Sequence, residues 1–130
     1  MLVICSNRGL CGGYNAGILR EATNSLNAAK SRGEETLLEL SGKRAISFFK
    51  YQQIIPVAIY INFEDKPRFD EVEPLADKFI REFVAGNVDA VDVAYMKFLN
   101  PARQLPVVET ILPFAKPNDS SAATAKKTDN

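Results

Sequence analysis

An α/β fold built around a mostly parallel sheet is predicted by three features of the sequence. The run from Leu2 to Cys5 is apolar throughout and too short for a helix, which is typical of a strand buried on both faces. Strand-like and helix-like stretches then alternate along the chain. Two segments of alternating hydrophobicity follow them. Together these features predict a three-layer α/β/α sandwich with a mostly parallel, Rossmann-like sheet and a C-terminal antiparallel strand.

The first predicted helix follows a glycine-rich turn. Asn15 belongs to the residue types that cap helices, and apolar residues recur on one stripe from there to about Lys30. The stripe consists of Ile18, Leu19, Ala22, Leu26 and Ala29. Arg32-Gly33 is expected to end this helix.

Two short strands are predicted in the middle of the chain. The first covers 36–40 and is followed by a turn at Ser41-Gly42. The second covers 57–61, where β-branched and aromatic residues gather. Pro56 precedes it and limits this segment to a strand start or an edge strand, because proline cannot donate to a sheet.

Two further helices are predicted around the second of these strands. Residues 43–51 suit a short helix whose inward face carries Ile46, Phe48 and Phe49. Residues 70–85 show the clearest helical stripe in the chain, and Gly86 is expected to close that helix. The stripe consists of Val72, Leu75, Ala76, Phe79, Ile80, Phe83 and Val84.

A hairpin and a polar tail are predicted at the end of the chain. Residues 88–99 and 105–112 alternate in hydrophobicity on either side of the turn sequence NPARQ, which predicts an antiparallel pair. From Ala115 onward the sequence is small and polar. We therefore expect a globular domain over 1–114 and a flexible tail or linker over 115–130.

Charge and hydropathy argue against several classes of protein. The 130 residues carry 16 basic and 16 acidic side chains, and the pI is near 6.3, so neither nucleic acid nor an anionic membrane is an expected partner. No apolar run of about 18 residues predicts a transmembrane helix, and no signal peptide is evident. A core strand that begins at residue 1 suggests a single domain excised from a longer chain.

The two cysteines, Cys5 and Cys11, are predicted to be free thiols in a reducing compartment. Cys5 continues a buried strand, where a small apolar thiol packs well. Cys11 is interpreted as a close-packed loop residue, because only Arg8 lies near enough in sequence to lower its pKa. A redox-responsive domain that uses both thiols stays open as an alternative.

The stretch CSNRGLCGGYN, residues 5–15, places glycines between a strand and a helix, where α/β folds often bind phosphate. No G-x-G-x-x-G pattern can be drawn through it. Gly12 to Gly17 satisfies G-x-x-x-x-G, but Ile18-Leu19 follow where a P-loop needs Lys and Ser or Thr. We favour a tight strand-to-helix turn over the alternative, a small α/β nucleotide- or phosphate-binding protein that uses the Gly9–Gly13 loop.

Residues for catalysis or metal binding are sparse. The sequence has no histidine, which excludes Ser-His-Asp and Cys-His arrangements. One string of carboxylates is crowded but not convergent, so caps and solvated charge are favoured over a metal site. The string consists of Glu64, Asp65, Asp70, Glu71 and Glu73. The residues alone predict an α/β interaction module, not an enzyme, with no metal and no cofactor.

Three motifs resemble one family. SNRGLCGGYNAGILR, from Ser6 to Arg20, resembles the signature of the gamma chain of rotary (F-type) ATP synthases. GKRAISFFK, residues 42–50, resembles a phenylalanine-rich segment of that family. DAVDVAYMKFLN and PVVETILPF resemble its long strand, its Tyr-x-x-Phe pattern and its terminal Leu-Pro. The resemblance covers about residues 1–114 and indicates the central globular α/β domain of that chain.

The resemblance implies a central-stalk, or rotor, subunit domain of the proton-transporting ATP synthase. Such a domain is inserted between N- and C-terminal helices that form a coiled coil, and it transmits torque between the membrane ring and the catalytic alpha–beta hexamer during ATP synthesis or hydrolysis. The implied partners are the alpha and beta chains, the epsilon chain and the membrane c-ring. The domain itself would be non-catalytic and peripheral, on the cytoplasmic side of a bacterial inner membrane or at an organelle inner membrane.

The resemblance also implies a contact site in the first motif. Its subunit-contact candidates are Asn7, Arg8, Gly9, Leu10, Cys11 and Gly12. Arg8 would pair transiently with acidic residues of the beta chain, because an exposed ion pair is weak enough to break at every turn. Asn7 stands where the family usually has Asp, which removes a charge beside Arg8, while its side-chain oxygen can still cap the turn.

Overall fold

The computed structural model describes residues 1–7, 14–61 and 69–113 and shows one five-stranded sheet. The strands, β1 to β5 in chain order, are Leu2–Ile4, Glu39–Ser41, Ala58–Tyr60, Val91–Asn100 and Arg103–Leu112. Their order across the sheet is β3-β2-β1-β4-β5. The first four strands are parallel, and β5 pairs antiparallel with β4, so the predicted mixed sheet is confirmed.

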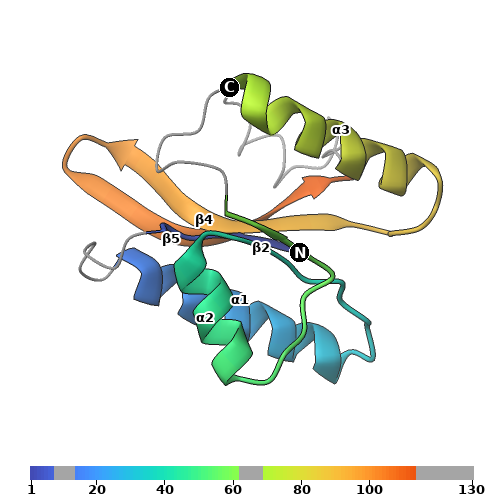
Figure 1. Ribbon diagram of the computed structural model, residues 1–130, viewed down its shortest axis with the longest axis horizontal. Coiled ribbons are helices and arrows are strands. Elements are labelled where there is room, and N and C mark those ends of the chain that lie inside the picture. The colour runs from blue at the N-terminus through green and yellow to red at the C-terminus, as the bar shows by residue number, and fades with distance from the viewer. Residues whose placement is uncertain (8–13, 62–68, 114–130) are drawn as a thin grey trace, which may run out of the picture.

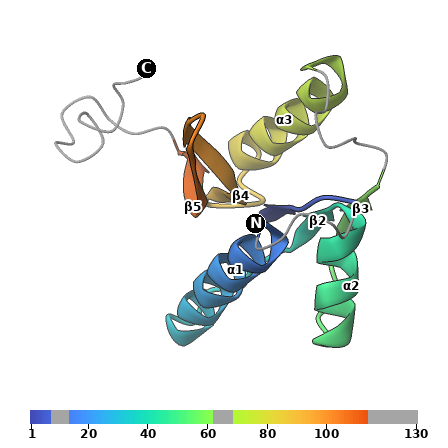
Figure 2. The same cartoon turned by 90° about the vertical axis from the view of Figure 1, so that its left-hand side faces the viewer.

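The helices lie on both faces of the sheet. Helices α1, α2 and α3 cover Tyr14–Ser31, Lys43–Tyr51 and Phe69–Val84. Figures 1 and 2 show α1 and α2 on one face and α3 on the opposite face. The predicted three-layer α/β/α sandwich is therefore confirmed, and the order of its strands matches a doubly wound fold with a switch point between β1 and β4.

The two faces of the sheet carry separate cores. On the α1 and α2 face, ten buried residues pack together, and Phe49, Ile18, Leu40 and Val3 are its largest fully buried side chains. A smaller core lies under α3, where Leu75 and Phe79 pack on strand residues. Because successive strand side chains point to opposite faces, Leu2 belongs to the core under α3 and Val3 belongs to the core under α1 and α2.

A charged cluster fixes α3 to the sheet. Glu39 in β2 is only 8% exposed, and both its oxygens lie 2.9 Å from Nζ of Lys78 on α3. The hydroxyl of Tyr60 in β3 donates to Glu39 at 2.6 Å. Burial alone would lower the pKa of Lys78, but its hydrogen bonds to Glu39 and Tyr60 outweigh that effect and raise the pKa.

Two sequence expectations need correction here. The predicted strand 36–40 begins instead at Glu39, because β2 is held opposite the three residues of β1. The predicted apolar stripe of α3 is only partly buried: Leu75 and Phe79 face the core, whereas Ile80 and Val84 are 45% and 78% exposed. Strands β1, β2 and β3 have three residues each, so they are too short to cover the whole length of the 16-residue helix α3.

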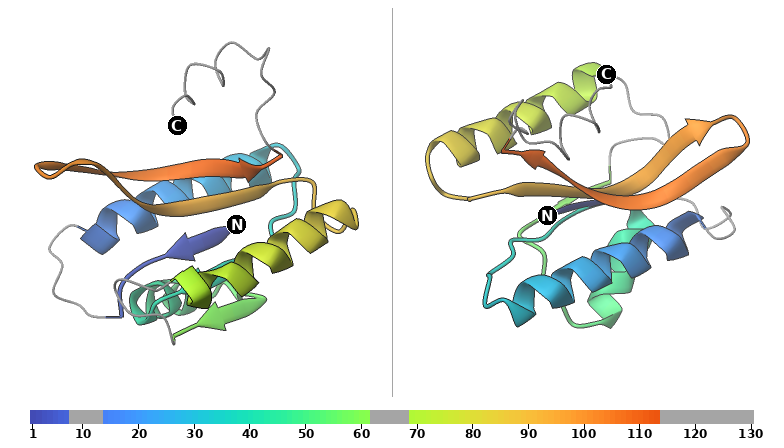
Figure 3. Two further views of the ribbon diagram at one scale, coloured as in Figure 1. Left: turned by 90° about the horizontal axis from the view of Figure 1, so that it is seen from above. Right: turned by 180° about the vertical axis from the view of Figure 1, so that it is seen from behind.

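The β4–β5 hairpin extends beyond the other strands and has a shorter turn than predicted, whereas β4 starts at Val91, three residues after its predicted start at residue 88. β5 starts at Arg103, so the turn is confined to residues 101–102, and Asn100 closes it by accepting a hydrogen bond from the Ala102 amide. β1 pairs with β4 only at Val93 and Ala94, which leaves the outer half of the hairpin past the sheet (Figure 3). Pro106 is tolerated because β5 is an edge strand.

Gly42, the residue that precedes α2, lies against the backbone of Cys5. Its φ is +99°, and a Cβ atom placed there would lie 2.1 Å from the carbonyl oxygen of Cys5. Gly86 also has a positive φ, of +80°, but no atom lies within 4 Å of the position of its Cβ. Among the glycines that the structure describes, backbone strain and a steric clash coincide at Gly42.

We expect Gly42→Ala to destabilise the protein by at least about 3 kcal/mol, because it adds a clash with strand backbone to a strained φ. The matched control Gly86→Ala carries only the strained φ and should cost about 1–2 kcal/mol. Urea unfolding of both variants measures the difference. Equal destabilisation by the two substitutions would show that the close approach of Gly42 to Cys5 is not a constraint.

Candidate functional site at the carboxyl ends of the strands

The resemblance implies a subunit-contact site at the turn after β1, which lies at the switch point of the sheet where α/β folds often bind ligands. Of its candidate residues, Asn7 is described. Arg8, Gly9, Leu10, Cys11 and Gly12 lie outside the described residues. The site is therefore built from the residues that flank this turn: Cys5, Ser6 and Asn7 on the β1 side, and Asn15 on the α1 side.

Ser6 and Asn15 join the two sides of the turn. The Ser6 amide donates to Oδ1 of Asn15 at 3.0 Å, and Nδ2 of Asn15 donates to Oγ of Ser6 at 2.9 Å. Both residues are buried. The expectation that Asn15 caps its own helix is wrong, because α1 begins at Tyr14 and the side-chain oxygen of Asn15 bonds to the strand that precedes the turn.

Asn7 bridges two other elements. Its Oδ1 accepts a hydrogen bond from the amide of Lys43, the first residue of α2, at 2.9 Å. Its Nδ2 donates to the carbonyl oxygen of Ile61, just after β3, at 3.3 Å. The predicted capping role of the Asn7 oxygen is thus exerted on α2, which lies 36 residues further along the chain.

The first amides of α2 are occupied by the chain itself. Lys43 donates to Asn7, and the Arg44 amide donates to the carbonyl oxygen of Ser6 at 3.2 Å. Phosphate binding at a helix N-terminus requires amides that are free to point at the anion. At the start of α2, the amides of Lys43 and Arg44 are therefore already hydrogen-bonded within the chain and are not free to bind an anion.

The thiol of Cys5 is buried against this junction. Cys5 is free and 7% exposed, so its predicted burial is confirmed. Burial raises the pKa of this thiol to about 12, and the nearby charge of Arg44 offsets only part of that effect. A thiol of this kind is unreactive at neutral pH, which argues against a redox role for Cys5.

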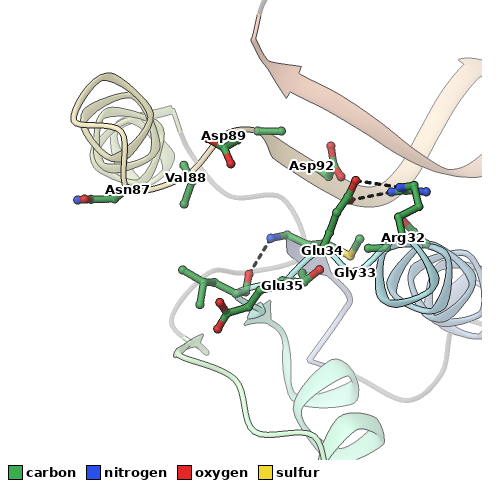
Figure 4. Close-up of a pocket in the computed structure, with 14 residues that line it drawn as sticks. Arg32, Gly33, Glu34, Glu35, Asn87, Val88, Asp89 and Asp92 are labelled. Atoms are coloured by element: carbon green, nitrogen blue, oxygen red, sulfur yellow. Dashed lines mark hydrogen bonds and ion pairs between the residues drawn. The ribbon is translucent and has the colours of Figure 1, made fainter.

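A cavity of about 630 Å³ lies at the opposite end of the sheet, near the amino ends of the strands, between the loops that follow α1 and α3. Its lining includes four acidic side chains and one basic side chain, and Figure 4 shows Glu34 paired with Arg32 while Asp89 and Asp92 approach from the start of β4. Glu34 and Arg32 make two contacts of 2.9 Å. Sequence reasoning missed this cavity because its two walls lie more than fifty residues apart.

Metal binding and membrane insertion find no support in the described part of the chain. No cluster of three metal-ligating side chains occurs there. Of the predicted acidic string, Glu64 and Asp65 lie outside the described residues, and Glu73 is exposed on α3. None of the described helices combines the length and the apolar character that a membrane span needs.

The fold and the site define a doubly wound α/β domain whose strand-to-helix junctions are held together by its own polar side chains. A family model described as ATP synthase matches residues 1–130, and the chain therefore belongs to the ATP synthase family. The predicted resemblance is thereby confirmed.

Its relatives are gamma chains. The sequence is 37% identical over 130 residues to the ATP synthase gamma chain of Rhodopirellula baltica, which covers all of this chain and 44% of that one. It is 39% identical over 113 residues to the gamma chain of Leptospira biflexa, which covers 87% of this chain and 39% of the relative. The chain thus spans less than half the length of these curated relatives.

A solved structure shares the fold. A chain in the cryo-EM structure of the Euglena gracilis mitochondrial ATP synthase rotor, in rotational state 1, superposes with a TM-score of 0.58. The match has 18% sequence identity and covers 84% of this chain and 37% of that chain. At this identity the similarity supports the fold.

The buried thiol gives a direct test of the site. In a Cys11→Ser variant, Cys5 is the sole thiol, and burial shifts its pKa from 9.0 to about 12. The thiolate fraction at pH 8 should therefore fall about a thousandfold relative to the unfolded chain. We expect an aromatic disulfide reagent to label folded protein about a thousandfold more slowly than protein unfolded in urea. Labelling within about tenfold of the unfolded rate would contradict the buried thiol.

Proposed function

We propose that this chain is the globular α/β domain of a gamma chain in the central stalk of a rotary ATP synthase. In this role it transmits torque between the membrane ring and the catalytic alpha–beta hexamer during ATP synthesis or hydrolysis. The proposal rests on membership of the ATP synthase family, on relatives that are gamma chains, and on one feature of the fold.

That feature is the position of the two ends of the sheet domain. Leu2, at the start of β1, lies opposite Val93, and Leu112, at the end of β5, lies opposite Val91. The two ends therefore lie on either side of the same end of β4, as the left view of Figure 3 shows. A domain whose ends converge in this way can be inserted between two adjacent helices without displacing them.

The domain boundaries form part of the proposal. The insert would cover 1–114 and the linker 115–130, and long N- and C-terminal helices would be supplied by the additional length that the relatives have. The packed hydrophobic cores on both faces of the sheet support a domain that moves as one body, as a torque-transmitting element requires.

The contact site is proposed at the first motif. Asn7 bonds to the backbone of Lys43 and Ile61, and Asn15 bonds to Ser6, so the segment between Asn7 and Asn15 starts and ends at fixed points. We place the subunit contacts at residues 7–12, with Arg8 pairing transiently with acidic residues of the beta chain. The epsilon chain and the c-ring are the other proposed partners.

The domain itself is proposed to be non-catalytic and to bind no cofactor, with the nucleotide sites on other chains. The absence of histidine from the sequence and the occupied first amides of α2 support this view. The proposed location is the periphery of the membrane, on the cytoplasmic side in a bacterium or at an organelle inner membrane.

A chimera tests the proposal. The matching part of the Rhodopirellula baltica gamma chain is replaced by this sequence, and ATP-driven proton pumping is measured in vesicles that contain the assembled enzyme. We expect pumping within about threefold of the native enzyme, because a rotor domain of the same fold should carry the same torque. A chimera with Gly42→Val is the control and should fail, since the clash with Cys5 disrupts the domain.

Two results would contradict the proposal. One is a chimera that assembles in normal amounts but does not pump. The other is ATP binding by this chain with a Kd well below about 1 mM that Gly12→Val abolishes, which would favour the phosphate-binding alternative.

A further inference from the structure

A groove between α1 and α2 has features that the proposed function does not use. The two helices lie side by side on one face of the sheet (Figure 2), and a cavity of about 460 Å³ opens between their N-terminal halves. We refer to it as the α1–α2 groove. Leu19 and Phe48 provide an apolar surface, and Arg20, Thr23, Asn24 and Arg44 provide polar groups.

The groove carries uncompensated positive charge. Arg20 lies on α1 and Arg44 on α2, and both are exposed. Neither guanidinium has a carboxylate partner within the described residues, although Arg32 at the other end of α1 is paired with Glu34. Two free guanidinium groups that line one cavity favour a ligand with carboxylate or other anionic groups, which arginine binds in a bidentate manner.

A buried hydroxyl in the same groove lacks a partner. Oγ1 of Thr23 is inaccessible to solvent and makes no hydrogen bond to any described group. Threonine in a helix usually bonds back to a carbonyl one turn earlier, and a buried unpaired hydroxyl costs stability. Because this oxygen is inaccessible, a ligand in the groove could bond to it only after the Thr23 side chain rotates, so the contact surface consists of the two arginines and the apolar side chains.

The size and lining of the groove indicate the kind of ligand. A single oxyanion would fill a small part of 460 Å³ and would leave the partly buried Phe48 uncovered. A nucleic acid requires a broader basic surface than two arginines on a chain with no net charge. A peptide segment with both carboxylate and apolar side chains satisfies the two arginines and the apolar surface together.

We propose that the α1–α2 groove binds an acidic peptide segment of a neighbouring protein chain, with Arg20 and Arg44 holding its carboxylates and Leu19 and Phe48 packing against an apolar side chain. This surface is distinct from the proposed contact at residues 7–12, and the inference does not depend on the rotor function. Such binding weakens with added salt, because the ion pairs are at the surface.

The test uses the ¹⁵N-labelled protein and a defined probe, an acetylated and amidated octapeptide of alternating glutamate and leucine. We expect the peptide to shift amide signals of α1 and α2 residues that line the groove, and high salt to weaken the binding. Arg20→Gln and Arg44→Gln should each weaken it about tenfold, as expected for the loss of a charged hydrogen bond at an interface. Arg81→Gln, an exposed arginine on α3, is the matched control and should have no effect.

Two further arms separate the alternatives. A peptide with glutamine in place of glutamate should bind at least about tenfold more weakly. Inorganic phosphate should bind the groove more weakly than the acidic peptide. The proposal is overturned if the acidic peptide leaves the groove signals unchanged, if Arg81→Gln weakens binding as much as Arg20→Gln, or if phosphate binds at the groove as tightly as the peptide.

Discussion

The rest of the structure depends on the three residues that follow β1. Cys5 donates its amide to β2, Ser6 bonds to the Asn15 side chain in α1 and to the Arg44 amide, and Asn7 holds the start of α2 and the end of β3. These contacts connect four elements that are far apart in the sequence. Residues 5–7 are therefore a structural junction, and the close approach of Gly42 to the Cys5 carbonyl shows how closely the chain packs there.

The helices could be predicted from the sequence because their signals are local. Apolar stripes placed α1, α2 and α3 within about one residue of their observed bounds, and a glycine marked the ends of α1 and α3. The start of β2 could not be predicted in the same way. Its start at Glu39 is set by pairing with the three residues of β1, which are distant in the sequence, and the buried Glu39 carboxylate is compensated by Lys78 and Tyr60, 39 and 21 residues away.

The candidate site was predictable only in outline. The motif SNRGLCGG indicated a turn and its family, and the residue type of Asn7 indicated a side-chain cap. That Asn7 caps α2, and that Asn15 bonds to Ser6 instead of to its own helix, follows from the packing of distant segments. The acidic cavity and the α1–α2 groove were missed for the same reason, since each is assembled from separate segments.

Native-state hydrogen exchange tests the central claim, that the segment after β1 holds the domain together. The amides of Ser6 and Lys43 donate to the side chains of Asn15 and Asn7, so in the intact protein they should exchange only through openings nearly as costly as global unfolding. In an Asn7→Ala variant, the protection of the Lys43 amide against exchange should fall. The protection of the α3 amides should fall only as much as the global free energy of unfolding does. Exchange of Ser6 and Lys43 at the rate of an exposed loop in the unmodified protein would contradict the account.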